Sequence, residues 1–188
     1  MWKKILFGLA VVILVAVAVV ATRPAEYVVE RRASIGAPPA LVYAALIDFR
    51  RWRTWSPWAA LDPAQQEEYG GAASGVGATY HWSGNDAVGE GRMTVTEARP
   101  DEYVAIRLEF LRPFPSDNVV EYEIAADDAG SVATWRMTGR NGFVGKAYAL
   151  FVDMDSMLGS DFEKGLAALG RVVEADARAV AAPPAPAP

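Results

Sequence analysis

Three successive segments in the second half of the chain alternate between apolar and polar residues. They span residues 103–110, 118–126 and 132–139. In the first of them, for example, the apolar residues Ile106 and Leu108 flank Arg107. A period of two residues is that of a β-strand with one buried face and one wet face. The connections between the segments are short, as at 127–130, and they favour an antiparallel meander whose single apolar face another element must cover.

Further strands are predicted on the N-terminal side of this meander. They span residues 27–35, 78–83 and 89–99. After the first of them, Pro38 and Pro39 stop the strand and favour a helix start, so a short helix is predicted over 40–47. A second short helix is predicted over 49–55, and Pro57 ends it. The expected order is one strand, two short helices and then the remaining strands of a sheet of about six to seven.

One long amphipathic helix is predicted at the end of the domain, over residues 146–178. Its apolar residues recur every three or four positions. Gly159 and Gly165 are expected either to bend this helix or to let it approach the sheet closely. The predicted fold class is therefore α+β: a curved antiparallel sheet wrapped around a long C-terminal helix, with a pocket closed by the helix on one side.

The N-terminus carries an uncharged run from residue 5 to residue 21, preceded by Lys3 and Lys4. At about 1.5 Å per residue this run is about 26 Å long, slightly less than the hydrocarbon core of a bilayer. We interpret residues 1–24 as a retained membrane anchor. The alternative is a cleaved signal peptide, but its small-residue site at 16–18 lies inside the apolar run. The two lysines favour a cytoplasmic N-terminus and an extracytoplasmic domain, although Arg23 weakens this orientation.

The remaining chain is divided into a binding domain over residues 25–179 and a disordered Ala/Pro tail over 180–188. The net charge is −5, and it becomes about −7 without the +2 of Lys3 and Lys4. An acidic domain is a poor partner for nucleic acid, so no such binding is expected. The absence of cysteine excludes disulfides, thiolate metal sites and cysteine nucleophiles. No cofactor is expected, and the sequence leaves the oligomeric state open.

Several short motifs follow the predicted elements in order along the chain. They are Ile35-Gly36-Ala37-Pro38 with Val42-Tyr43 and Asp48, Trp52 with Trp55-Ser56-Pro57-Trp58, Gly75-Val76-Gly77-Ala78, Trp82-Ser83-Gly84, Gly89-Glu90-Gly91-Arg92-Met93, Thr134-Trp135, and Phe162-Glu163-Lys164-Gly165-Leu166. With this element order, the stretch from Tyr27 to Asp176 resembles the START-like (SRPBCC) helix-grip proteins of the polyketide cyclase/dehydrase type. The resemblance implies a deep cavity for lipids, polyketides or other apolar molecules, and it leaves the activity open.

The candidate ligand-binding residues are large apolar side chains on the inner faces of the strands and of the long helix. They are Trp82, Met93, Phe110, Tyr122, Trp135, Met154, Met157 and Phe162. The alternative for each is ordinary core packing. The tryptophans at positions 52, 55 and 58 raise the same question, since they either pack the short helices or form the rim of the pocket.

The sequence offers no clear catalytic group. His81 is the only histidine, so it cannot build a multi-histidine metal site, and a surface role is expected for it. Glu67 and Glu68 are expected to face solvent. An acid or base made by a buried Arg31, Asp48, Glu90 or Arg92 stays open.

The leading functional hypothesis is a membrane-tethered binding or carrier domain for a hydrophobic small molecule. A cyclase- or dehydrase-type enzyme is the second hypothesis, and it requires a polar residue with a strongly shifted pKa inside the cavity. The third is an envelope protein-interaction module with a vestigial pocket.

Overall fold

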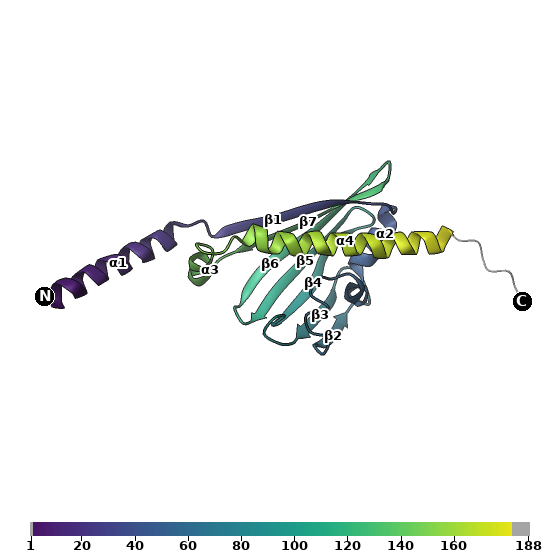
Figure 1. Ribbon diagram of the computed structural model, residues 1–188. Coiled ribbons are helices and arrows are strands. Elements are labelled where there is room, and N and C mark those ends of the chain that lie inside the picture. The colour runs from purple at the N-terminus through teal and green to yellow at the C-terminus, as the bar shows by residue number, and fades with distance from the viewer. Residues whose placement is uncertain (1, 182–188) are drawn as a thin grey trace, which may run out of the picture.

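A computed structural model of the protein describes residues 2–181. The helices and strands are α1 (Trp2–Thr22), β1 (Glu26–Ile35), α2 (Pro39–Ile47), the 3₁₀ helix η1 (Phe49–Thr54), β2 (Gln66–Gly71), β3 (Ala78–Ser83), β4 (Glu90–Arg99), β5 (Tyr103–Arg112), β6 (Ser116–Asp127), β7 (Gly130–Arg140), α3 (Phe143–Tyr148) and α4 (Met154–Ala181). The seven strands form one antiparallel sheet in the order β1-β7-β6-β5-β4-β3-β2. The predicted fold class is confirmed, because α4 lies across one face of this open sheet and α1 projects away from it (Figure 1).

The alternation in the sequence corresponds to the two faces of the sheet. In β7, Ala133, Trp135 and Met137 are buried, whereas the residues between them are partly exposed. In β6, Tyr122 is paired in register with Trp135, and both side chains point to the inner face. The inner face is thus apolar along its central strands, as the pattern predicted.

β2 is the one strand that the sequence did not predict. Its residues Glu67 and Tyr69 lie on the inner face, since they pair across the strands with Trp82 and Tyr80 of β3. The expectation that Glu67 faces solvent is therefore wrong, because only 8% of its side chain is exposed. A strand whose inward residues are polar lacks the apolar alternation that identifies a strand.

The predicted single helix over 146–178 is divided into α3 and α4, so that prediction is wrong in its N-terminal part. The side chain of Asp153 accepts hydrogen bonds from the backbone N–H groups of Asp155 and Ser156, at 3.0 and 3.4 Å, and from the Ser156 hydroxyl at 2.7 Å. These bonds satisfy backbone donors that a helix start leaves free, and α4 therefore begins at this point. At its other end α4 includes Val180 and Ala181, and the rest of the predicted tail, 182–188, lies outside the described residues.

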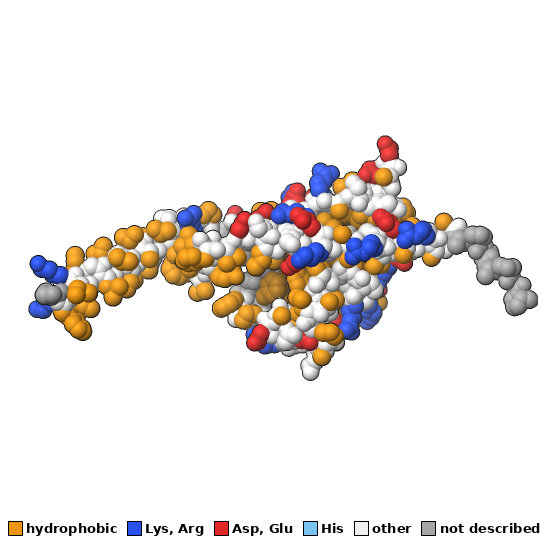
Figure 2. Space-filling view, viewed as in Figure 1, with side chains coloured by type: hydrophobic (Ala, Val, Ile, Leu, Met, Phe, Trp, Pro, Cys, Tyr) orange, Lys and Arg blue, Asp and Glu red, His pale blue; other side chains and the backbone are white. Residues whose placement is uncertain are grey.

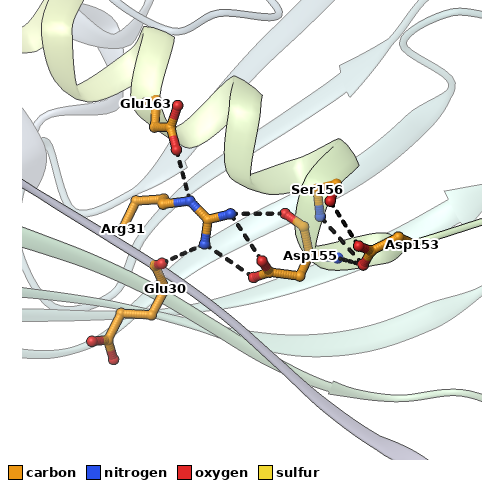
Figure 3. Close-up of polar contacts among 6 residues, drawn as sticks. All are labelled: Glu30, Arg31, Asp153, Asp155, Ser156 and Glu163. Carbon is orange, nitrogen blue, oxygen red and sulfur yellow. Dashed lines mark hydrogen bonds and ion pairs between the residues drawn. The ribbon is translucent and has the colours of Figure 1, made fainter.

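A cluster of charges fixes the first turns of α4 to β1 (Figure 3). The Arg31 guanidinium donates to both carboxylate oxygens of Asp155, at 3.0 and 2.9 Å, and to Glu163 at 2.9 Å. These bonds raise the pKa of Arg31, which is thus firmly charged. Gly159 allows this approach, because a Cβ atom at that position would lie 2.0 Å from Nη2 of Arg31.

The helices cover the sheet unevenly. α4 packs mainly against β1 and α2, while α2 contacts β5, β6 and β7. Gly165 lets α4 approach the sheet closely at Trp135, which was one of the two roles expected for that glycine. Within residues 2–181, the main contacts of α4 are with β1 and α2 rather than with β2, β3 or β4, and this uneven cover leaves space inside the fold.

Candidate functional site

A cavity of about 830 Å³ lies between the inner face of the sheet, η1, α3 and the first turns of α4. Ligand pockets in proteins usually measure about 300–1,000 Å³ and are lined mainly by apolar side chains. Figure 2 shows hydrophobic side chains gathered around a hollow beside α4. Large apolar residues dominate the wall, namely Phe49, Trp52, Trp58, Trp82, Met93, Leu108, Phe110, Val120, Trp135, Met137, Leu158 and Phe162.

The structure brings seven of the eight candidate ligand-binding residues together on this wall. They are Trp82, Met93, Phe110, Tyr122, Trp135, Met157 and Phe162. The eighth is Met154, whose side chain lies outside the described residues, so its role stays a prediction. These side chains come from five strands and one helix, and the fold alone makes them neighbours.

The aromatic candidates line the cavity and also pack against one another in the core, so the two alternatives do not exclude each other. The Trp135 ring is stacked on Phe162, with ring centroids 4.2 Å apart, and it also contacts Tyr122 at 5.1 Å. Trp55 is buried behind them and is not on the wall, whereas Trp58 packs edge-on against Trp135 at 5.8 Å and does line the cavity. Such aromatic packing fixes the rings, so the wall is rigid on this side.

The cavity opens between β6 and α3. Phe114, Phe143, Val144 and Tyr148 line it and are also exposed, as residues at a mouth must be. The short helix α3 contacts the C-terminal end of α1, where the Lys146 ammonium donates to the Ala21 carbonyl at 3.3 Å. The mouth therefore lies near the C-terminal end of the apolar helix α1.

At the edge strand β2 the cavity wall carries a cluster of polar side chains. The Glu67 carboxylate accepts hydrogen bonds from the Tyr69 hydroxyl at 2.9 Å, the Tyr80 hydroxyl at 3.2 Å and the Gln65 amide at 2.8 Å. Arg53 lies 3.4 Å from the same carboxylate. All five side chains line the cavity. None of its members belongs to a known catalytic motif, so the cluster was not predicted from the sequence.

In this cluster the pKa of the carboxyl group is lowered and the pKa values of the two phenols are raised, so all three lie further from neutral pH than their ordinary values. Burial would raise the pKa of Glu67, but the bonds from Gln65, Tyr69 and Tyr80 and the charge of Arg53 together hold it below its ordinary value. Burial, with the bond to Glu67, raises the pKa of Tyr69 to about 12 and also raises that of Tyr80. At neutral pH the carboxylate is thus charged and both phenols are protonated.

The other titratable residues considered from the sequence lie outside the cavity wall. His81 is on the outer face of the sheet, with Nε2 3.2 Å from a carboxylate oxygen of Glu90. Asp48 caps η1 by accepting from the Arg50 backbone N–H at 2.9 Å. Among residues 2–181, no group of three or more histidine, aspartate and glutamate side chains is arranged to hold a metal ion.

A sequence family described as "Polyketide cyclase / dehydrase and lipid transport" matches residues 27–174. The chain belongs to this family. The match includes every strand and most of α4, and the predicted resemblance to START-like, polyketide-cyclase-type proteins is confirmed. Among curated proteins, none matches the chain.

Solved structures with the same fold are distant in sequence. SA2116 from Staphylococcus aureus, described as a protein of unknown function, is 15% identical with a TM-score of 0.60, and the match covers 83% of this chain and 98% of that one. CV1439 from Chromobacterium violaceum is 16% identical with a TM-score of 0.58, over 78% and 96% of the two chains. The di-domain ARO/CYC StfQ from the steffimycin biosynthetic pathway is 11% identical with a TM-score of 0.58, over 81% of this chain and 52% of that one. At these identities the likeness establishes the fold.

Proposed function

We propose that the protein is a membrane-tethered binding or carrier domain for a hydrophobic, lipid- or polyketide-like molecule. The observation that carries this proposal is the cavity of about 830 Å³ with its mostly apolar wall. Burying an apolar ligand surface yields about 25 cal/mol per Å², so such a wall supplies affinity without any specific bond. In this proposal residues 25–179 form the binding domain, and the seven cavity-lining candidates contact the ligand.

The polar cluster at Glu67 is the observation that favours a cyclase- or dehydrase-type enzyme as the second candidate. A general acid or base works best when its pKa lies near the working pH. Here the pKa of Glu67 is lowered and those of Tyr69 and Tyr80 are raised, so each group holds its protonation state at neutral pH. This argues for a role in binding. A vestigial pocket in a protein-interaction module is less consistent with the open volume.

The membrane tether is part of the proposal. α1 is 21 residues long with a mean hydropathy of 3.0, which is long and apolar enough to cross a membrane, although a signal sequence has the same properties. The exposed apolar residues at the cavity mouth support a retained anchor, because α3 holds them beside the end of α1. Lys3 and Lys4 would lie in the cytoplasm and the domain on the extracytoplasmic side. A ligand that partitions into the bilayer would then be concentrated at the mouth.

The test is to identify what the cavity holds. The full chain is purified in lipid nanodiscs, extracted with organic solvent and analysed by mass spectrometry against empty nanodiscs. We expect an apolar molecule that is enriched with the protein. In the variant Val120→Phe, the cavity-lining Val120 is replaced by a larger side chain, and retention should fall.

Val119→Phe is the matched control, since its neighbour Val119 points to the outer face and is 43% exposed. Retention in this control should equal that of the wild type. Extracts identical to empty nanodiscs, or equal retention in both variants, would refute the proposal.

A further inference from the structure

The polar cluster on the cavity wall has a bonding pattern that selects one kind of ligand group. This inference rests on the proposed function and names its ligand class. Each phenol of Tyr69 and Tyr80 has a single hydrogen, and in both residues that hydrogen is donated to Glu67. The amide nitrogen of Gln65 donates to Glu67 at 2.8 Å and to the Tyr80 oxygen at 3.1 Å. Neither phenol therefore has a donor left for a ligand.

Acceptor capacity, in contrast, remains in the cluster. The Tyr69 oxygen donates one bond and accepts none from the protein, and the Tyr80 oxygen accepts only from Gln65. The side-chain carbonyl of Gln65 makes no hydrogen bond within the described residues. A ligand group that donates a hydrogen bond would therefore find an acceptor here, whereas neither phenol can donate to a ligand.

The charges of the cluster restrict the group further. Arg53 lies 3.4 Å from the Glu67 carboxylate and the Arg50 guanidinium lies over the Tyr69 ring at 5.1 Å, so an ammonium group would meet two positive charges beside the single carboxylate. A carboxylate or phosphate would meet the ionised Glu67 and two phenols whose hydrogens are already donated to it, so among these side chains only a guanidinium could donate to the anion. A neutral hydroxyl fits, because it can donate to a tyrosine oxygen and accept from a remaining N–H of Arg53.

The rings around the cluster define the adjoining apolar part of the site. Tyr80 stacks on Trp82 with ring centroids 5.8 Å apart, and Tyr69 also packs against Tyr80, with ring centroids 5.2 Å apart. Beyond Trp82, Phe110 continues the apolar wall at 5.9 Å. We propose that the cavity binds an apolar molecule with a neutral hydroxyl group, an alcohol or a phenol, and that Tyr69, Tyr80 and Gln65 accept from this hydroxyl.

The test compares matched probes with and without a hydroxyl hydrogen. Radiolabelled dodecanol and dodecyl methyl ether form the aliphatic pair, and para-octylphenol and para-octylanisole form the aromatic pair. Each is equilibrated with the full chain in lipid nanodiscs, and binding is the excess over empty nanodiscs. One net hydrogen bond corresponds to about a three- to tenfold change in affinity. We expect at least one hydroxyl probe to bind that much more tightly than its ether, and the preferred pair tells alcohol from phenol.

Variants assign this preference to the cluster. The variant Gln65→Leu/Glu67→Leu/Tyr69→Phe/Tyr80→Phe removes every side-chain acceptor of the cluster, and it should bind the hydroxyl probe and its ether equally. Removing the phenols alone would leave Gln65 in place and free the Glu67 carboxylate to accept from the same hydroxyl. Tyr103→Phe is the matched control, because the Tyr103 hydroxyl also donates to a glutamate, Glu121, but lies outside the cavity wall. This control should keep the full preference. The quantity compared is the ratio of the affinities of the hydroxyl probe and its ether for the same variant. A loss of stability lowers both affinities, so it largely cancels in this ratio.

Two results would overturn the hydroxyl proposal alone: equal binding of both members of each pair by the wild type, or a preference that survives in the quadruple variant. Tighter binding of dodecanoate than of dodecanol would do the same. If no probe binds above empty nanodiscs, the carrier function itself fails, and this inference fails with it. The experiment therefore separates the two failures.

Discussion

Replacing Gly165 of α4 by alanine tests how tightly the helix is packed on the sheet. A Cβ atom at this position would lie 2.7 Å from Cζ3 of Trp135 and 3.2 Å from Cδ of Pro57. The Trp135 ring is stacked on Phe162, so it has little freedom to move away. The helix or the ring must therefore shift, and the packing around the cavity must shift with it.

The size of the effect follows from two opposing contributions. Alanine in a helix interior is more favourable than glycine by about 1 kcal/mol. Overpacking a well-filled core costs about 1–3 kcal/mol. Gly165→Ala should therefore change the free energy of unfolding by between roughly zero and 2 kcal/mol in the destabilising direction.

Gly170→Ala is the matched substitution in the same helix. Its Cβ would meet Ile35 at 3.6 Å and Glu174 at 4.0 Å, which are ordinary contacts. Only the helix-propensity gain remains, so this variant should be stabilised by about 1 kcal/mol. Thermal unfolding of the full chain in detergent micelles, followed by circular dichroism, resolves the pair, since 1 kcal/mol corresponds to about 2–4 °C in a domain of this size. If Gly165→Ala raises Tm as much as Gly170→Ala does, α4 does not contact Trp135 as closely as described here.

Three further predictions concern the membrane, the polar cluster and the charged cluster. The chain has no cysteine, so a fluorescent dye can be attached at one introduced cysteine. A dye at Phe151→Cys, next to α3 and 88% exposed, should be quenched by nitroxide lipids, whereas a dye at Asp128→Cys in the distant β6–β7 turn should not be quenched. Equal quenching at the two positions would contradict membrane contact at the cavity mouth. Because the pKa of Glu67 is lowered in the folded state, the stabilising contribution of its carboxylate is present above the ordinary pKa of 4.5 and is lost as the pH falls through the pKa of the folded state. Chemical denaturation should therefore show that the difference in unfolding free energy between the wild type and Glu67→Gln becomes smaller in acid. A difference that grows in acid would mean that the pKa of Glu67 is raised on folding. Gly159→Ala should lower Tm because its Cβ displaces Arg31, and the same substitution in an Arg31→Met background should be harmless; equal losses in both backgrounds would rule out the clash.

The sheet and the long helix could be predicted because their patterns are periodic. Alternation in segments such as 132–139 identifies buried strand faces directly, and the spacing of apolar residues identifies α4. The break before α4 was missed, because apolar Leu150 and Phe151 continue the helical spacing while Asp153 begins a new helix. A capping side chain gives a weaker sequence signal than an apolar period.

The candidate site could be predicted only in its apolar part. Trp82 and Trp135 could be assigned to the inner face from strand alternation, but whether space lies in front of them depends on how α4 is placed over the sheet. The polar cluster could not be predicted, since Glu67 and Tyr69 lie on an edge strand without apolar alternation. Their partners Arg53 and Tyr80 come from other elements, and only the fold brings them together.

Photochemical crosslinking tests the central claim, that the cavity itself holds the apolar molecule. Dodecanol carrying a diazirine is equilibrated with the full chain in nanodiscs and illuminated, and the modified residues are mapped by peptide mass spectrometry. We expect modification of the cavity wall in β3, β6 and β7, with competition by unlabelled dodecanol and loss in Val120→Phe. Modification confined to α1 and the outer face of the domain would place the probe in the bilayer and contradict the account.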